Sequence, residues 1–233
     1  MHTWRTTPQR RYNVVLTPIL IAATIGYLLG SLPFGYLVAR AKGVNIFEVG
    51  SKNPGATNVR RVLGPALGNL VLFLDALKGA VASGWPLLWS WTQNGSITHP
   101  DEVVAIAGVV AALLGHSFSC FTRFKGGKGV ATGAGGFLLV FPLGMMIAIA
   151  VWVATALLTR FVSLASMLGA VSLPVAAVVM QRSTVLISVT AVIAVFVIYR
   201  HRANVARLLS GTESKIGQKA AAAQVSSSAP NHE

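Results

Sequence analysis

The chain has 233 residues, of which 54% are hydrophobic and only 11% are charged, and its formal net charge is +13. This composition excludes an ordinary soluble domain, and the single cysteine, Cys120, excludes an internal disulfide and a cysteine-rich metal site. We therefore expect an all-α, polytopic membrane protein. Basic cytoplasmic loops explain the positive charge, so no nucleic-acid partner is expected.

Uncharged stretches long enough to cross a bilayer recur along the chain. A hydrocarbon core of ~30 Å needs roughly 20 helical residues. The first stretch is too long for the hydrophobic part of a signal peptide and lacks a small-residue cleavage site, so we expect it to be retained. The uncharged stretches are 13–39, 103–122, 129–159, 161–181 and 183–199, and residues 62–91 are apolar apart from Asp75 and Lys78.

The number of spans follows from the longest stretch and from the loop charges. Pro142 lies in the middle of 129–159 and removes a backbone donor there, so we expect two short helices. With seven spans, one side carries 14 of the 19 Lys and Arg residues and the other carries four, whereas six spans divide them evenly. The positive-inside rule then predicts about seven transmembrane helices, with residues 1–15 in the periplasm and the C-terminus in the cytoplasm.

The first polar segment, "GSKNPGATNVRRVLG" from Gly50 to Gly64, follows the first span. Its serine, threonine and asparagine side chains offer hydrogen bonds, and Arg60 and Arg61 add guanidinium groups that suit a phosphate or carboxylate. The pattern indicates an anion site. A polar turn that caps the next helix is the equally supported alternative.

The second segment, "FKGGKG" from Phe124 to Gly129, places Lys125 and Lys128 among glycines whose backbone N–H groups are accessible. A helix that begins near Gly129 would direct its positive end to the same place. The segment is not a Walker loop, because Thr122 stands where a glycine is required and Gly129 follows the lysine instead of Ser or Thr. The upstream His116 is expected to be an interfacial hydrogen-bonding residue.

The third segment, "YRHRANVARLLSGTESK" from Tyr199 to Lys215, predicts a basic amphipathic helix after the last span. Arg200, Asn204 and Arg207 share one helical stripe, and His201 and Asn204 are an i, i+3 pair. A surface helix that contacts anionic lipid headgroups would show the same pattern.

Inside the second span, Asp75 and Lys78 are also three residues apart, and we interpret them as a structural ion pair.

Together these segments resemble the bacterial membrane acyl-phosphate:glycerol-3-phosphate acyltransferase family, PlsY. The resemblance is collinear from about Gly30 to Lys215. It rests on "GSLPFGYLVAR", "VGSKNPGATNVRRVLG", "FLDALKG", "GHSFSCFTRFKGGKGVATG", "RFVSLAS" and "YRHRANVARLLSGTESK".

The resemblance implies a multi-pass enzyme of the bacterial inner membrane whose active site faces the cytoplasm. Such an enzyme transfers a fatty acyl group from acyl phosphate to the 1-hydroxyl of glycerol 3-phosphate, giving lysophosphatidic acid and phosphate. No cofactor or metal is expected. Membrane lipid surrounds the enzyme, and a functional partnership with an acyl-phosphate-forming enzyme is implied. One membrane-embedded domain would span 16–217, followed by a disordered Ala/Ser-rich tail, 218–233.

Matching motif to motif assigns the site residues. Lys128 and Arg61 would be the principal phosphate clamps, and a substrate phosphate would take the hydroxyl proton, with His201 as general base the rival interpretation. The catalytic group is Lys128, Arg61, His201 and Asn204, and the substrate-binding group is Ser51, Thr57, Asn58, Lys125, Gly126, Gly127 and Gly129.

Departures from the family pattern concern residues outside that set. Lys52 replaces a usual glycine and puts the local turn in doubt, Pro54 stands where an aliphatic residue is common, Ser119 replaces a frequent proline and Ala203 a frequent glutamate.

An organic-phosphate transporter of the inner membrane is the alternative function, although no internal repeat is visible. A lipid-binding scaffold is a third, weaker alternative.

Overall fold

The computed structural model describes residues 8–94 and 99–218, and within these ranges the chain is helical and contains no strand. The expected all-α fold is therefore confirmed. Residues 1–7 of the expected periplasmic segment 1–15 and residues 219–233 of the expected tail 218–233 lie outside the described ranges, and both calls stay predictions. The helices are α1 (Pro8–Ser31), α2 (Phe34–Arg40), α3 (Ala56–Leu63), α4 (Pro65–Asn94), α5 (His99–Ser117), α6 (Val130–Val140), α7 (Pro142–Thr159), α8 (Val162–Val179), α9 (Thr184–Arg200) and α10 (Arg202–Leu209), with a short 3-10 turn at Cys120–Thr122.

The described segments contain five helices long and apolar enough to cross a membrane, and a sixth if α9 and α10 are counted together. The expected break at Pro142 is confirmed, since α6 ends at Val140 and α7 begins at Pro142. At 1.5 Å per residue, the 11-residue α6 is about 16 Å long, well short of a bilayer core. The count of seven spans is therefore not confirmed and remains a prediction.

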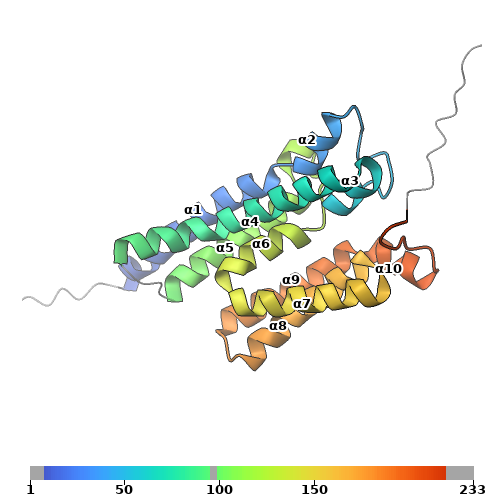
Figure 1. The fold of residues 1–233 in the computed structure, drawn as a ribbon. Coiled ribbons are helices and arrows are strands. Elements are labelled where there is room, and N and C mark those ends of the chain that lie inside the picture. Colours follow the sequence, from blue (N-terminus) through green and yellow to red (C-terminus); the bar gives the residue numbers. More distant parts are fainter. Residues whose placement is uncertain (1–7, 95–98, 219–233) are drawn as a thin grey trace, which may run out of the picture.

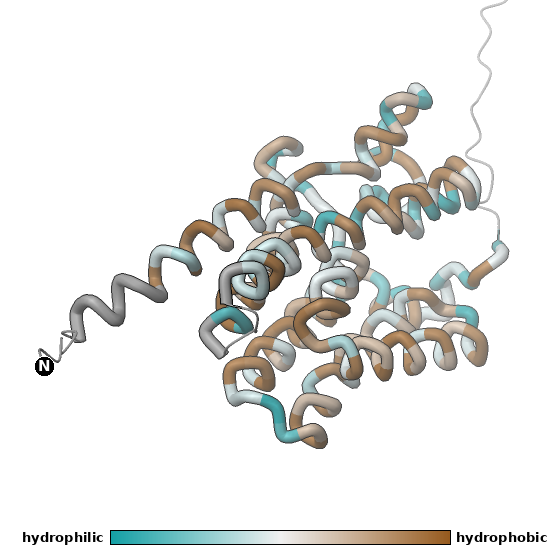
Figure 2. The backbone as a smooth tube through the Cα atoms, turned by 60° about the vertical axis from the view of Figure 1, so that its left-hand side comes forward, coloured by the Kyte–Doolittle hydropathy of each residue, from teal (hydrophilic) through white to brown (hydrophobic). Residues whose placement is uncertain are grey.

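The helices form two groups that lie side by side (Figure 1). Helix α1 packs on α5 and α4 packs on α6, while α7, α8 and α9 form the second group. A buried cluster joins the groups, because Phe137 of α6 and Phe141 share it with Ala148, Leu173 and Leu186 of the second group. Hydrophobic residues predominate along the helices, and hydrophilic residues gather toward the loops (Figure 2), as expected for a protein surrounded by lipid.

Glycines bring the first group of helices into backbone contact. A Cβ atom on Gly30 would lie 2.0 Å from the carbonyl oxygen of Ala112, and one on Gly79 would lie 1.9 Å from that of Thr132. In lipid, helix association depends on close van der Waals packing, which small residues permit. These contacts therefore hold α1 on α5 and α4 on α6, just beneath the polar segments.

The first span is broken at Leu32 and Pro33, between α1 and α2. Lys78 Nζ donates a 2.8 Å hydrogen bond to the Leu32 carbonyl oxygen, which also accepts a 3.1 Å hydrogen bond from the Phe34 N–H. The same amine lies 2.9 Å from Asp75 Oδ1, so the expected i, i+3 ion pair is confirmed. Both side chains are buried, which makes the pair part of the core of this helix group.

The third polar segment differs from the expected continuous amphipathic helix. Helix α9 ends at Arg200, and α10 leaves it at an angle of 58° after His201. The prediction of one stripe with Arg200, Asn204 and Arg207 is wrong in this respect. The physical reason is local: the His201 carbonyl accepts a hydrogen bond from the Asn204 N–H, starting a new helix in a new direction.

Candidate active site

The ends of several helices meet at one face of the bundle, where all three polar segments lie. Ser119 Oγ, after α5, donates a 2.6 Å hydrogen bond to the Ser31 carbonyl at the end of α1. Arg200, at the end of α9, donates hydrogen bonds to the carbonyl oxygens of Gly126 (3.0 Å) and Gly127 (2.7 Å). The first and last spans thus fix the lysine and glycine loop between them.

The loop delivers its lysine at the start of a helix, as expected. Gly129 has a positive φ of 81° and is the N-cap of α6, so the free N–H groups of the first helical turn lie beside Lys128. A Cβ on Gly129 would lie 2.9 Å from the side chain of Leu113, one turn inside the end of α5. The loop therefore descends along α5, which accounts for the shortness of α6.

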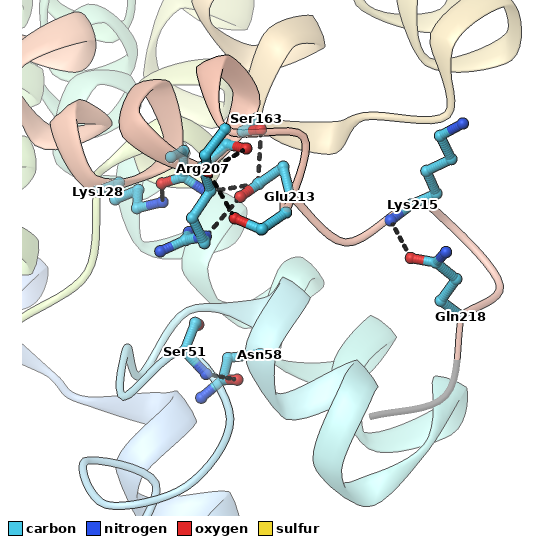
Figure 3. Close-up of polar contacts among 11 residues, drawn as sticks. Ser51, Asn58, Lys128, Ser163, Arg207, Glu213, Lys215 and Gln218 are labelled. Atoms are coloured by element: carbon cyan, nitrogen blue, oxygen red, sulfur yellow. Dashed lines mark hydrogen bonds and ion pairs between the residues drawn. The ribbon is translucent and has the colours of Figure 1, made fainter. Parts of the chain in front are cut away.

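Lys128 is half-buried, and its Nζ donates to Asn204 Oδ1 from α10. Asn204 Nδ2 in turn donates a 2.7 Å hydrogen bond to Glu213 Oε1. Glu213 also accepts from Ser163 Oγ and from Arg207 Nε, each at 2.7 Å (Figure 3). We call Ser163, Asn204, Arg207 and Glu213 the glutamate cluster. Its amide stands between the lysine and the carboxylate.

This arrangement sets the charge of Lys128. Burial lowers the pKa of Lys128 to about 8; the nearby Glu213 carboxylate opposes the shift, and Arg207, Arg200 and Arg61 add to it. Burial acts to raise the pKa of Glu213, but its hydrogen bonds to Asn204, Ser163 and Arg207 outweigh burial and hold that pKa below its usual value. Lys128 is therefore a cation with cationic neighbours and no direct carboxylate partner, which favours binding of an anion.

His201 is buried, with 3% of its surface exposed, and its Nδ1 donates a 2.8 Å hydrogen bond to the Val197 carbonyl. Burial, together with the charge of Lys128, lowers the pKa of His201 to about 4. At neutral pH the imidazole is uncharged, with its proton on Nδ1 and a lone pair on Nε2. No carboxylate among the described residues forms a hydrogen bond with this ring.

In the first polar segment, the buried Asn58 side chain stabilises the loop through hydrogen bonds to its backbone. It is 2% exposed, its Oδ1 accepts a 2.9 Å hydrogen bond from the Ser51 N–H, and its Nδ2 donates to the Val49 carbonyl at 3.1 Å (Figure 3). Both polar atoms of the amide are used by the loop backbone. Lys52 has a positive φ of 54°, so the turn keeps the left-handed conformation that a glycine would adopt without strain.

The structure brings together some of the expected site residues and leaves others apart. Lys128 and Asn204 are in direct contact, and His201 and Arg61 lie near enough to interact electrostatically with Lys128. Ser51, Thr57 and Lys125 are exposed on the same face of the bundle. Their side chains make no hydrogen bond with Lys128 or with the glutamate cluster within the described ranges.

Four residues of the site are absent from the sequence-based assignment: Ser163, Arg200, Arg207 and Glu213. Glu213 is one of only six acidic residues in the chain, and it stands in a segment that is otherwise basic and polar. That scarcity is the one signal that could have drawn attention to it. Its four-residue cluster depends on a tertiary contact between Ser163, at the start of α8, and the segment that follows α10.

Comparison with known proteins identifies the family. A model of the glycerol-3-phosphate acyltransferase family matches residues 20–211. The chain belongs to this family. Glycerol-3-phosphate acyltransferases from Desulforamulus reducens and Fusobacterium nucleatum are 42% and 46% identical to it, over 89% and 81% of this chain and 98% and 93% of theirs.

A solved structure agrees with the assignment. An integral membrane glycerol-3-phosphate acyltransferase, PlsY, in its glycerol 3-phosphate form superposes with a TM-score of 0.76 and 39% identity, covering 85% of this acyltransferase and 96% of that chain. Its lysophosphatidic acid form gives a TM-score of 0.73 with 38% identity, covering 85% of this acyltransferase and 95% of that chain. The resemblance read from the motifs is confirmed, and the transporter alternative finds no support among these relatives.

Proposed function

We propose that this acyltransferase takes its acyl group from acyl phosphate and transfers it to the 1-hydroxyl of glycerol 3-phosphate. The products are lysophosphatidic acid and inorganic phosphate, so the enzyme acts in phospholipid synthesis. The observation that carries the proposal is Lys128. It is a half-buried cation beside a helix N-terminus and glycine N–H groups, and an amide separates it from the nearest carboxylate. Both substrates of this reaction carry phosphate, which such a pocket would bind.

The reaction needs positioning and charge stabilisation more than a covalent intermediate. The 1-hydroxyl oxygen attacks the acyl carbonyl carbon, a new ester bond forms, and the bond between that carbon and the phosphate oxygen breaks. Negative charge moves onto the leaving phosphate, where Lys128 and Arg61 would offset it. Acyl phosphate is an activated mixed anhydride, so no enzyme nucleophile is required.

The hydroxyl proton goes to a substrate phosphate in this proposal. A base with a pKa of about 4, as for His201, accepts a proton poorly at neutral pH, whereas a phosphate monoester has its second pKa near ~6. His201 would serve instead as a neutral group that accepts a hydrogen bond at Nε2. Replacing His201 with Gln tests whether the histidine acts as the general base. If a substrate phosphate takes the proton, the variant should keep a large share of kcat, and the acidic limb of its pH profile should not move.

The remaining site residues are divided between the phosphates of the two substrates. Lys128, Arg61 and Asn204 would contact the leaving phosphate, and Gly126 and Gly129 would supply backbone N–H groups. Gly127, assigned to substrate binding from the sequence, would instead support the loop, because its N–H already donates to the His116 carbonyl. Ser51, Thr57 and Lys125 are exposed on the same face and would bind the second phosphate. Asn58 supports this group through the Ser51 backbone. Residues 16–217 would form the single catalytic domain, and an acyl-phosphate-forming enzyme would supply the donor.

We place the enzyme in the bacterial inner membrane with this face in the cytoplasm, because the face carries most of the basic residues. Cys120, the only cysteine and exposed on this face, gives a direct test. A membrane-impermeant maleimide should label it in lysed cells but not in spheroplasts. The matched control is Cys120→Ser combined with Thr184→Cys, on the opposite face, which should be labelled in intact spheroplasts. The reverse pattern would contradict the orientation.

The test of the reaction is phosphate release from palmitoyl phosphate by the purified protein, with and without glycerol 3-phosphate. Release should require glycerol 3-phosphate and yield lysophosphatidic acid. Lys128→Ala should lower kcat/KM by about 10³-fold, since loss of one positioned donor costs 10² to 10³-fold. The matched control, Lys42→Ala, removes an exposed lysine outside the pocket and should retain wild-type rates. No turnover by a well-folded wild-type protein would overturn the proposal.

A further inference from the structure

A second buried group of ionisable residues lies directly behind the lysine and glycine loop. His116 of α5 is 9% exposed at its side chain, and its Nδ1 lies 3.5 Å from Asp75 Oδ1 on α4. The acyl-transfer chemistry described above uses neither residue. Asp75 already has a charge partner in Lys78, at 2.9 Å. Neutralising the carboxylate therefore does not require the histidine.

The far edge of the His116 ring faces the loop. A Cβ atom on Gly127 would lie 2.1 Å from His116 Nε2, so only a glycine can rest against the ring. The Gly127 N–H also donates a 3.1 Å hydrogen bond to the His116 carbonyl. Gly126 is equally close, since its Cβ would lie 2.1 Å from that same carbonyl oxygen. The His116 ring therefore supports Gly127, and the His116 backbone carbonyl lies against Gly126 and accepts the Gly127 N–H.

Arg200 holds the same two peptide groups by hydrogen bonds to their carbonyl oxygens, at 3.0 and 2.7 Å. The loop is thus held by His116 from α5 and by Arg200 from α9. The next residue along the chain is Lys128. The orientation of the Gly126 and Gly127 peptides decides where the Lys128 Cα lies, and therefore how its amine reaches Asn204 and a bound phosphate.

We propose that Asp75 and His116 are positioning residues for Lys128: the carboxylate fixes the ring of His116, and the ring fixes the Gly126–Gly127 backbone from which Lys128 projects. This inference rests on the proposed function, because Lys128 must bind substrate phosphate for its position to matter. It assigns a role in the reaction to a pair that lies within the membrane-spanning helices, behind the substrate pocket. A displacement of about 1 Å in such a group can cost about 10²-fold in rate.

The test is a double-mutant cycle between His116→Phe and Lys128→Ala, read as the Kd of palmitoyl phosphate by calorimetry without glycerol 3-phosphate, and as kcat and KM where turnover is measurable. Phenylalanine keeps a flat ring beside Gly127 but loses the nitrogen that faces Asp75. In the wild-type background it should weaken binding about fivefold or more, and in the Lys128→Ala background less than about twofold. Asp75→Asn should behave like His116→Phe.

A purely structural role predicts a different result. The control Ser83→Ala removes a fully buried hydroxyl that bonds the Gly136 carbonyl, on the same helix as Asp75 but away from the loop. It should lower Tm and leave Kd, kcat and KM unchanged. The inference is overturned if His116→Phe lowers Tm without weakening binding, or if it weakens binding equally in both backgrounds. Failure of the proposed function would show separately, as absence of turnover by the wild-type enzyme.

Discussion

Two buried clusters in this enzyme contain the same three kinds of side chain and serve opposite purposes. Within the membrane, Lys78 lies 2.9 Å from Asp75, with His116 beside them. In the pocket, Lys128 lies near Glu213 and His201, but the Asn204 amide stands between the lysine and the carboxylate. A lysine in direct contact with a carboxylate is neutralised by it, whereas a lysine held one amide away keeps its charge for a substrate.

The carboxylates differ in the same way. Asp75 is balanced by the lysine of its own helix, three residues away. Glu213 is balanced by Arg207 and by hydrogen bonds from Ser163 and Asn204, so it needs no contact with Lys128. Arg207 therefore takes the place of Lys128 as the charged partner of the Glu213 carboxylate. The comparison teaches that the placement of one neutral amide separates the structural ion pair from the proposed phosphate site.

The largest effect is expected when the structural pair is broken. Lys78→Met leaves the Asp75 carboxylate buried without its cation, and breaking a buried ion pair costs about 3 to 5 kcal/mol. The free energy of unfolding should fall by that order, and the yield of folded protein with it. Thermal unfolding of the purified variant in detergent measures the change. An unchanged Tm would show that Asp75 does not depend on Lys78.

The next largest effect is expected when Lys128 is given a carboxylate as its direct partner. Asn204→Asp places a carboxylate in contact with Lys128, so the lysine should lose its capacity for substrate phosphate. We expect kcat/KM to fall by about 10²-fold, mostly through a higher KM for palmitoyl phosphate. Steady-state kinetics measure this, and Asn204→Ala, which removes the amide without adding charge, is the matched control. Equal losses in the two variants would contradict the charge argument.

The pH profile sharpens the comparison with a smaller effect. The pKa of Lys128 is lowered to about 8, so the free enzyme loses this cation as pH rises through that value, and kcat/KM should fall there. Glu213→Gln removes the negative neighbour that favours protonation, which lowers the pKa of Lys128 further. The alkaline limb should therefore move to lower pH, with about a tenfold loss at pH 8. A limb that stays in place or moves to higher pH would exclude Lys128 as the titrating group.

The smallest effect concerns the first polar loop, which carries no buried charge pair. Lys52 has a left-handed backbone conformation, with φ of 54°, which costs a non-glycine residue about 1 kcal/mol. Lys52→Gly should raise the unfolding free energy by up to about this amount and leave kcat within about twofold, because glycine adopts the conformation without strain. Chemical denaturation and steady-state assays measure both quantities. A large loss of kcat would assign Lys52 a contact with substrate.

Local patterns in the sequence predict part of this architecture. The apolar stretches and Pro142 predict the helices and the break between α6 and α7, because hydrophobic length and the missing proline donor act within one segment. Glycine spacing likewise indicates close helix packing. The expected stripe through Arg200, Asn204 and Arg207 is wrong, since periodicity assumes a continuous helix and the chain bends after His201.

The candidate site is predictable only in outline. The motifs place Lys128, Asn204 and Arg61 in the candidate site, and the reaction proposed for the family member explains why phosphate would be the ligand. Glu213, Ser163 and Arg200 stand in the same motifs but give no local sign of burial or of partners. Asn58 is the opposite case. Its residue type suggests a substrate-binding side chain, but both polar atoms of its amide form hydrogen bonds with the loop backbone.

The sequence by itself determined that the chain is an all-helical membrane protein with three polar segments bearing lysine, arginine and glycine, since hydropathy and residue type are local properties. Only the tertiary structure decided that Asn204 meets Lys128 across 76 positions of the chain and stands between it and Glu213. Helix packing brings such residues together, and the contacts formed there, not residue type, set which lysine pairs directly with a carboxylate and which is held one amide away from it.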